Sequence, residues 1–581
     1  MALAFKSFHP LSRALKNTKL LFCLGSIAFI VYIALANLFL LPAAVWSPDE
    51  GAKLLQLKNL RWQNHALNIE ILYPGTELDP ELKFALSDPK LDLLQVVDGK
   101  LIFQRLPIFP LLEKPLFKLA GYPGLYLLPA LCGALIGVIA LLMILPDHRR
   151  ALMWITIAFG SPVLIYSVIF WEHTLAALSG LSAAWLAIRL SEAEHLSSIR
   201  MFFGWLLVGM LLCLGIFLRL EMLIFSAALI TACLVYSKRR RWGPIVAACV
   251  VGLTWLLYQP AHELIMSGQS LPRNAQYLNY PLAYLRHAGW RSVVDILIGP
   301  FEDLAINPGW PGVLWTCASI LAILTSLRWF RKPIWRVVHL AALSLSAVIA
   351  LYFLITPDAY HSAHGLLFTT PWALLGVTRA REMWDTAGRR GKIIVVTALL
   401  GLTGYIVAMV GFRASSPHGG LEWGARLALV YYPLLALIAA WDINKKHGIE
   451  KAIILAMIFL GIGFQVRGLL TIRQDKLVNN SINQEILQAP EYYTISNMWW
   501  LALNTAPIYP AKAVQLATSP QEIASWVELA DQQGIKHFAL LVQDPAILDQ
   551  VAAQLPGLCL SIQGQDSFEG YIHYQLAVGC P

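Results

Sequence analysis

Charged residues are scarce in this chain of 581 residues: they make up 14% of it, whereas 57% of its residues are hydrophobic. Soluble proteins contain about a quarter charged residues, so this composition excludes an ordinary soluble protein. The sequence also lacks an internal repeat of fixed period, a low-complexity stretch, and any cysteine pair with the spacing of zinc ligands. Repeat architectures and cysteine-based zinc sites are therefore excluded as well.

The apolar residues are gathered in runs close to the roughly 20 residues that cross a bilayer as a helix. The first run, 20–41, is too long for the core of a signal peptide and lacks a small-residue cleavage site, so we interpret it as a retained helix. The sequence predicts thirteen spans, at about 20–41, 122–145, 151–170, 174–190, 202–218, 222–236, 243–260, 312–327, 337–355, 365–380, 393–411, 427–441 and 452–470.

The net charge of +9 is explained by the distribution of basic residues between the spans. Alternate short loops and the N-terminal segment contain 24 of the 44 lysines and arginines. Because cytoplasmic loops are enriched in basic residues, this pattern predicts a cytoplasmic N-terminus and, with an odd number of spans, an extracytoplasmic C-terminus. Topology accounts for the basic surplus, and no nucleic-acid partner is expected.

Two parts are predicted: a transmembrane part, 1–470, with a long first external loop at 42–121, and an external tail, 471–581. In the tail, Ser519 and Glu522 have the spacing of a helix capping box. The segment 537–544, "HFALLVQD", is typical of a buried strand that follows a helix ending near Gly534. The predicted fold is an all-α polytopic membrane protein with a small C-terminal α/β domain.

The eight cysteines fall into two groups. Six lie within predicted spans, where cysteine behaves as a small apolar residue. The other two, Cys559 and Cys580, lie in the tail. A disulfide between them suits an oxidising compartment, and two free thiols are the alternative.

Acidic residues follow the first span directly, as "WSPDEGAK", which places Asp49 and Glu50 at the outer membrane face. One interpretation is structural: Asp49 caps a helix that starts at Gly51. The other is functional, because ionisable groups near bilayer depth are costly and usually serve a purpose.

Four further segments on the same side carry polar residues close to the membrane. Taken singly, each residue is more often structural or interfacial than functional. Five charged outer segments together predict a shared polar cavity at the external face. The residues of the four segments are Glu172 and His173; Arg219 and Glu221; Asp358, Tyr360, His361 and His364; and Glu422 and Arg426.

Three stretches resemble a known family. "SPDEGAKLLQLKNL" after a first helix, "FQRLPIFPLLEKPLFKLAG" before a span and "GGLEWGARLALVYYPLLAL" are similar to parts of the membrane glycosyltransferases of the GT-C fold. Within these, the chain resembles the branch of protein O-mannosyltransferases and lipid A aminoarabinose transferases. The resemblance covers the whole chain in layout, and its motifs are short.

The resemblance implies an enzyme of the bacterial plasma membrane that transfers a sugar from a polyprenyl-phosphate carrier to an acceptor. It implies Asp49 as the base, Glu50 as a secondary or orienting acid, and Arg105 as the cation facing the phosphate. Arg219, Arg426, His361 and His364 are further candidates for the phosphate by position. The chain departs from the aminoarabinose transferases at residue 104, where Gln replaces the family's glutamate.

Three questions stay open at this point. A divalent cation is one alternative, with Asp49 and Glu172 as its first ligands, because hard cations prefer carboxylate oxygens. The acceptor is a glycan, a lipid or a protein. The alternative functions are a flippase for a lipid-linked sugar and a non-catalytic assembly subunit. Transporters usually bind near the membrane midplane between repeated halves, whereas the charges here lie at the outer ends of spans, which favours the enzyme.

Overall fold

The computed structural model describes residues 9–63, 66–86, 93–103, 105–144, 150–193, 197–237, 241–265, 296–297, 309–327, 332–356, 363, 365–415, 422–555, 557–568 and 570–579. The chain forms two compact units. The first, which we call the membrane unit, comprises Met1–Ala36, Tyr126–Ala261 and Asn274–Thr471. The second, the loop–tail unit, comprises Asn37–Leu125, His262–Arg273 and Ile472–Pro581.

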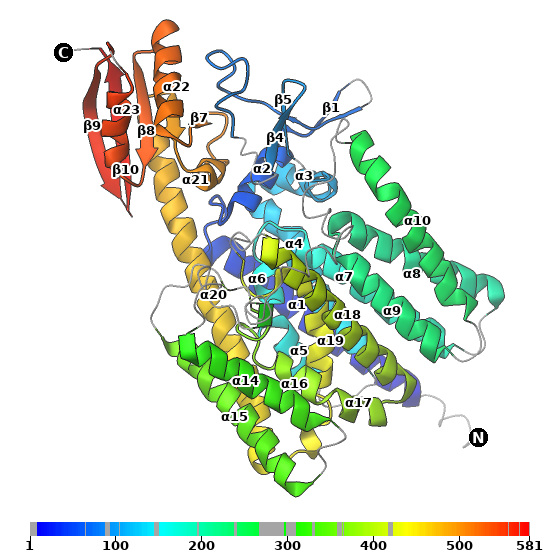
Figure 1. Cartoon of the computed structure of the whole chain (residues 1–581). Helices are drawn as coiled ribbons and strands as arrows, with labels where there is room; N and C mark the ends of the chain where they lie inside the picture. The colour runs from blue at the N-terminus through cyan, green and yellow to red at the C-terminus, as the bar shows by residue number, and fades with distance from the viewer. Residues whose placement is uncertain are drawn as a thin grey trace. The chain divides into compact units, whose positions relative to one another are not determined.

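The membrane unit is helical (Figure 1). By length and composition, seven helices of the described residues can cross a membrane, and three shorter apolar helices accompany them. The α-helices are α1 (His9–Ala34), α4 (Leu127–Leu142), α5 (Arg150–Ala158), α6 (Val163–Tyr166), α7 (His173–Glu192), α8 (Ser198–Leu218), α9 (Met222–Tyr236), α10 (Trp242–Ile265), α14 (Gly309–Ser326), α15 (Pro333–Ile355), α16 (Ala373–Thr378), α17 (Ala380–Thr386), α18 (Gly388–Ser415), α19 (Tyr431–Ala439) and α20 (Gly448–Gln488). The short helices are η1 (Leu35–Phe39), η3 (Arg426–Ala428) and η4 (Ile443–Lys445).

Three of the thirteen predicted spans are not single long helices. The run 151–170 is divided into α5 and α6 around the sequence Gly160-Ser161-Pro162, and the run 365–380 becomes helical only at Ala373, after Pro371. The run 427–441 contains the nine-residue helix α19, all of whose residues are buried. Apolar runs of this length form helices in a protein core as well as spans, and α19 packs on α4, α5 and α16 inside the unit.

The loop–tail unit joins the first external loop to the C-terminal tail. Its elements are α2 (Pro48–Asn59), β1 (Arg61–Gln63), β2 (Ala66–Asn68), β3 (Glu70–Ile71), β4 (Leu94–Val97), β5 (Lys100–Phe103), α3 (Ile108–Ala120), η2 (Tyr122–Tyr126), the end of α20 from Ile472, β6 (Tyr493–Ser496), α21 (Trp499–Asn504), β7 (Ala513–Leu516), α22 (Pro520–Gln532), β8 (His537–Val542), α23 (Ala546–Ala553), β9 (Leu560–Phe568) and β10 (Tyr571–Val578).

The tail contains a mixed five-stranded sheet with strand order β7-β6-β8-β10-β9. Strand β6 is parallel to β7 and β8, whereas β10 is antiparallel to β8 and β9. One face of the sheet packs on α22 and α23 around Trp526, Phe538 and Tyr574. The predicted α/β tail is therefore confirmed.

The predicted capping box and strand of the tail are both present. Ser519 accepts a hydrogen bond from the Glu522 amide at 3.2 Å, and Glu522 accepts one from the Thr518 amide at 2.6 Å. Helix α22 is followed by Gly534, at a φ of +75°, and β8 begins three residues later. The first hydrogen bond satisfies an amide that the first turn of a helix leaves unpaired, and the second ties the residue before the cap to that turn.

The first external loop shares the core of the tail, where it was predicted to belong to the transmembrane part. Leu78 and Phe84 of the loop lie in the same hydrophobic cluster as Trp526. The Leu516 amide at the end of β7 donates to the Phe84 carbonyl at 2.9 Å. These contacts explain why 37–125 and 472–581 form one unit.

Candidate functional site

The first turn of α2 carries the two acids of the first loop. The helix begins at Pro48 with Ser47 as its N-cap, whose hydroxyl accepts a hydrogen bond from the Glu50 amide at 3.3 Å. Proline at the first helical position and Ser-x-x-Glu are both typical of a helix start. The interpretation of Asp49 as the cap of a helix starting at Gly51 is wrong, because Ser47 performs that role.

Glu50 is held inside the loop–tail unit, with 1% of its surface exposed. Its carboxylate accepts a hydrogen bond from the Trp46 amide at 2.6 Å and lies 3.8 Å from the ammonium of Lys476, which is fully buried. Two unit charges at that distance attract strongly when water is excluded. Glu50 therefore anchors the start of α2 to α20.

Helix α20 also holds the chain that leads into α2. Asp475 accepts a hydrogen bond from the Trp46 indole at 2.9 Å, and the Asn479 side chain donates to the Val45 carbonyl at 3.0 Å. Residues 475 and 479 are one turn apart and lie on the same side of the helix. The segment before the two acids is thus fixed by side chains as well as by the cap.

The rest of α2 packs on the tail. Gly51 approaches the backbone of Leu503 in α21 so closely that a β-carbon would overlap the Leu503 carbonyl. At the other end of α2, the Lys58 ammonium donates to the carbonyls of Ala506, Pro507 and Tyr509 at 2.9, 2.8 and 3.1 Å. Helix α2 is therefore clamped at both ends within the loop–tail unit.

One face of α2 carries Asp49 together with Lys53 and contacts the backbone of Arg105. Asp49, Lys53 and Gln56 are spaced at i, i+4 and i+7, so they lie along one face of the helix. The Gln56 side chain donates to the backbone carbonyl of Arg105 at 3.0 Å. Asp49 is half-buried, as is Arg105. Sequence reasoning missed Lys53, although its i+4 spacing from Asp49 was a usable signal.

The membrane unit contains a second group of charges, at the turns between helices. Arg219 follows α8, Glu172 precedes α7 and Glu221 precedes α9. The Arg219 guanidinium lies 3.0 Å from the Glu172 carboxylate and 2.8 Å from the Glu221 carboxylate. All three side chains are largely buried. The structure thus brings together three of the predicted residues as an ion triad.

A second ion pair adjoins the triad through an aromatic stack. Arg426 lies 3.1 Å from Glu422, and its guanidinium lies over the Trp171 ring at 4.9 Å from the centroid. The rings of Trp171, Tyr166 and His173 contact one another, with centroids 5.1 to 5.6 Å apart. Because Trp171 precedes Glu172 in the chain, the pair and the triad form one connected group of predicted residues.

The backbone around Glu422 is fixed by hydrogen bonds within the membrane unit. The Ala363 amide donates to the Glu422 carbonyl at 2.9 Å, and the Gly424 amide donates to the Ala363 carbonyl at 2.6 Å. The amide of the intervening Trp423 donates to the Tyr166 hydroxyl at 3.2 Å. These bonds position the ion pair beside the aromatic stack.

Both arginines of this group already face carboxylates. Arg219 pairs with Glu172 and Glu221, and Arg426 pairs with Glu422. Charge-assisted pairs of this kind are strong where water is excluded. Because a guanidinium carries five N–H donors, a phosphate bound here would share each arginine with its glutamates.

The predicted site residues are distributed over both units. Asp49, Glu50 and Arg105 belong to the loop–tail unit, whereas the ion triad, the adjoining pair and His173 belong to the membrane unit. Asp358, Tyr360, His361, His364 and Cys580 lie outside the described residues. Cys559 forms a disulfide, and its pairing with Cys580 stays a prediction.

No family model matches the sequence, and no curated protein matches it. Among solved structures, the chain is similar to the archaeal oligosaccharyltransferase AglB from Archaeoglobus fulgidus in complex with an inhibitory peptide and a dolichol-phosphate. The identity is 10%, over 90% of this chain and 69% of that one, with a TM-score of 0.43.

The chain is also similar to ArnT from Cupriavidus metallidurans bound to undecaprenyl phosphate. The identity is 13%, over 96% of this chain and 97% of that one, with a TM-score of 0.43. For ArnT in the apo state, the identity is 14%, over 97% and 98% of the two chains, with a TM-score of 0.40. These are similarities of layout, and function is proposed below from the residues of this chain.

Proposed function

We propose that this chain is an integral membrane glycosyltransferase that moves a sugar from a polyprenyl-phosphate carrier to an acceptor hydroxyl at the outer membrane face. Asp49 is the base, and Arg105 is the cation that faces the departing phosphate. The observation that supports this proposal is that one face of the clamped helix α2 carries the half-buried carboxylate of Asp49 and holds the backbone of Arg105.

Distances along the helix suit the two roles. Asp49 and Gln56 are seven residues apart, which corresponds to about 10 Å along the axis. Gln56 holds the Arg105 backbone at that point, so the arginine lies about one donor length from the acid. A sugar and its phosphate have a similar length. The face can therefore place a base near the acceptor oxygen and a guanidinium near the phosphate.

The chemistry requires both groups. Asp49 accepts the proton of the acceptor hydroxyl, whose oxygen then attacks the anomeric carbon of the donor sugar. The new carbon–oxygen bond forms as the bond between that carbon and the phosphate oxygen breaks, with inversion at the carbon. The polyprenyl phosphate leaves with the bonding electrons, and the planar guanidinium of Arg105 stabilises its charge.

Glu50 has a different role in this proposal. Its contacts with Trp46 and Lys476 bury it and hold it in place, so it orients the first turn of α2 and leaves proton transfer to Asp49. Arg219 and Arg426 stay candidates for phosphate binding in the membrane unit. Each already pairs with a glutamate, so a bound phosphate would share the guanidinium with that carboxylate.

The experiment compares Asp49→Asn with Ser47→Ala in the purified protein, reconstituted in liposomes with a panel of polyprenyl-phosphate sugars. A crude envelope extract supplies the acceptor, whose identity need not be known. Turnover is measured by mass spectrometry as the release of free polyprenyl phosphate. Asp49→Asn should reduce turnover by about 10² to 10⁴, the usual effect of losing a general base. Donor binding should be retained.

Ser47→Ala is the matched control. It removes the helix cap, which costs about 1 kcal/mol of stability, but it leaves the carboxylate of Asp49 in place. Its turnover should stay near that of the wild type. Full turnover in Asp49→Asn would refute the assignment of the base, and movement of the donor across the bilayer without release of phosphate would favour the flippase.

A further inference from the structure

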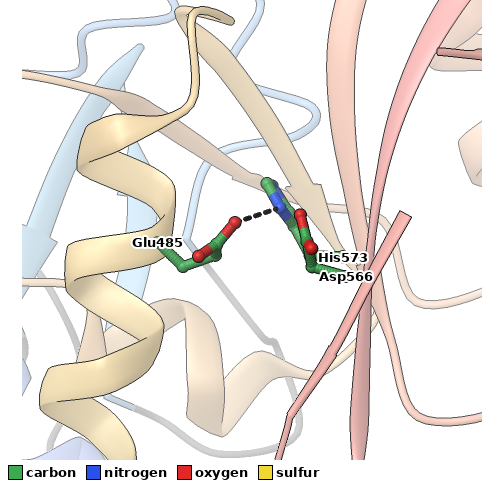
Figure 2. Close-up of side chains that lie close together, drawn as sticks. All are labelled: Glu485, Asp566 and His573. Atoms are coloured by element: carbon green, nitrogen blue, oxygen red, sulfur yellow. Dashed lines mark ion pairs between the residues drawn. The ribbon is translucent and has the colours of Figure 1, made fainter. Parts of the chain in front are cut away.

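Three side chains of the types that bind metals meet on one face of the tail sheet (Figure 2). Asp566 of β9 and His573 of β10 are direct partners in the antiparallel register, which brings their β-carbons to about 5 Å. Glu485 reaches the same place from α20, with its carboxylate 3.4 Å from His573 Nδ1. One ligand atom from each residue lies within 4.8 Å of the others.

Strand alternation places this group away from the packed face of the sheet. Ile572, Tyr574 and Leu576 contact the core formed with α22 and α23. Successive side chains of a strand point to opposite faces, so His573 points to the other face, where Glu485 lies. The group is therefore part of the contact between the end of α20 and the β9–β10 hairpin.

Among the described residues, the contact of His573 with Glu485 is a loose one. The His573 side chain is fully buried, and neither ring nitrogen has a hydrogen-bond partner there. The 3.4 Å approach to Glu485 is longer than a well-formed hydrogen bond. Buried polar groups are nearly always satisfied, so a fully buried imidazole aimed at two carboxylates indicates a missing partner.

The electrostatics suit a cation. The charged groups that act on the imidazole are all acidic, namely Glu485, Glu491 and Asp566. Imidazole is the commonest metal ligand in proteins. Asp566 is exposed and Glu485 is partly exposed, so an ion has a path from solvent.

We propose that Glu485, Asp566 and His573 form a binding site for a divalent transition-metal ion, with zinc as the best fit. One imidazole nitrogen and two carboxylate oxygens are ligands that Zn²⁺ accepts at about 2.0 to 2.2 Å, with water at a fourth position. Mg²⁺ and Ca²⁺ prefer oxygen ligands alone. Closure around Zn²⁺ requires the two carboxylates to move inward by roughly 1 Å, which their side-chain torsions allow.

The ion would join α20 to the β9–β10 hairpin and thereby stabilise the tail. This role is distinct from the proposed catalytic face, because none of the three ligands lies on α2. The site also differs from the metal site predicted from the sequence, whose ligands were to be Asp49 and Glu172. Glu172 is instead bound to Arg219 in the membrane unit.

The test uses the purified full-length protein, stripped with a chelator and then titrated with Zn²⁺ in a metal buffer. We expect one tightly bound Zn²⁺ per chain and, at 100 times the dissociation constant, a rise in melting temperature of about 5 to 10 °C. X-ray absorption of the bound zinc should show one imidazole among oxygen ligands.

Asp566→Asn is the informative variant because Asp566 is exposed and its loss should not unfold the domain. It should weaken Zn²⁺ binding at least tenfold and abolish the rise in melting temperature, as should Glu485→Gln. Asp549→Asn, an exposed acid on α23, is the matched control and should bind as the wild type does. Asp49→Asn should keep the metal, so loss of the proposed catalysis and loss of this site are distinguishable.

Two outcomes would overturn the proposal. The first is a wild-type protein that binds no stoichiometric Zn²⁺ or Mn²⁺. The second is an Asp566→Asn protein that binds Zn²⁺ as tightly as the wild type, since the ion would then lie elsewhere.

Discussion

The buried pair of Glu50 and Lys476 allows a quantitative prediction. The two charges lie 3.8 Å apart, and each side chain is at most 1% exposed. At an effective dielectric constant of about 20, such charges attract by about 4 kcal/mol. Removing one partner leaves the other charge buried without compensation, which costs about 3 to 5 kcal/mol. Glu50→Gln and Lys476→Met should therefore each destabilise the protein by that amount.

The double variant distinguishes a charge pair from two separate packing effects. Glu50→Gln combined with Lys476→Met removes both charges, so no uncompensated charge remains. Its loss of stability should be smaller than the sum of the two single losses by about 3 kcal/mol, the coupling expected of residues in direct contact. The measurement is thermal and denaturant unfolding of the four proteins in the same detergent.

Asp49→Asn provides the control, since the carboxylate of Asp49, next to Glu50 in the chain, is only half-buried. A carboxylate in the first turn of a helix contributes about 0.3 to 1 kcal/mol through the helix dipole, so this change should have little effect on stability. If the two single losses simply add, or if Glu50→Gln is as stable as the wild type, the structural role assigned to Glu50 is refuted.

Two further changes test the clamping of α2. Gly51→Ala should destabilise the protein by about 1 to 3 kcal/mol because its β-carbon overlaps the Leu503 backbone. Gly252→Ala is the control, since a β-carbon at this position of α10 meets open space and should leave stability unchanged. Thermal unfolding of the two variants measures the difference. Burial lowers the pKa of Lys58 from 10.5 to about 8, so between these pH values the unfolded chain binds more protons. The free energy of unfolding should therefore rise with pH across this window, and unfolding at pH 7.5 and 9.5 should show no such rise in Lys58→Met.

The membrane class and the tail could be predicted because both depend on local patterns. Apolar runs of about 20 residues indicate spans, and the box of Ser519 and Glu522 marks a helix start whose hydrogen bonds are local. The same patterns did not predict how short α19 is. Its residues are apolar because protein surrounds them, and composition alone does not distinguish a protein interior from lipid.

The partners of the candidate residues could not be predicted, because they lie far apart in the chain. Glu50 and Lys476 are 426 residues apart, and Trp46 and Asp475 are 429 apart. The union of the first loop with the tail depends on these contacts and on Leu78 and Phe84 entering the tail core. The group of Glu485, Asp566 and His573 likewise depends on strand register and on the end of α20, which no spacing in the sequence reveals.

The consecutive acids Asp49 and Glu50 illustrate how environment separates the roles of like residues. Adjacent positions of a helix point about 100° apart, so only one of them can face the interior at α20. Glu50 does so, and it gains a buried ammonium and a backbone amide as partners. These contacts fix the position of Glu50 at the start of the helix. Asp49 is half-buried, and it shares a face of α2 with the buried side chains of Lys53 and Gln56. Two neighbouring carboxylates with different surroundings commonly take different roles, so the division that we propose, with Asp49 as base and Glu50 as a structural acid, follows from the direction in which α2 is clamped.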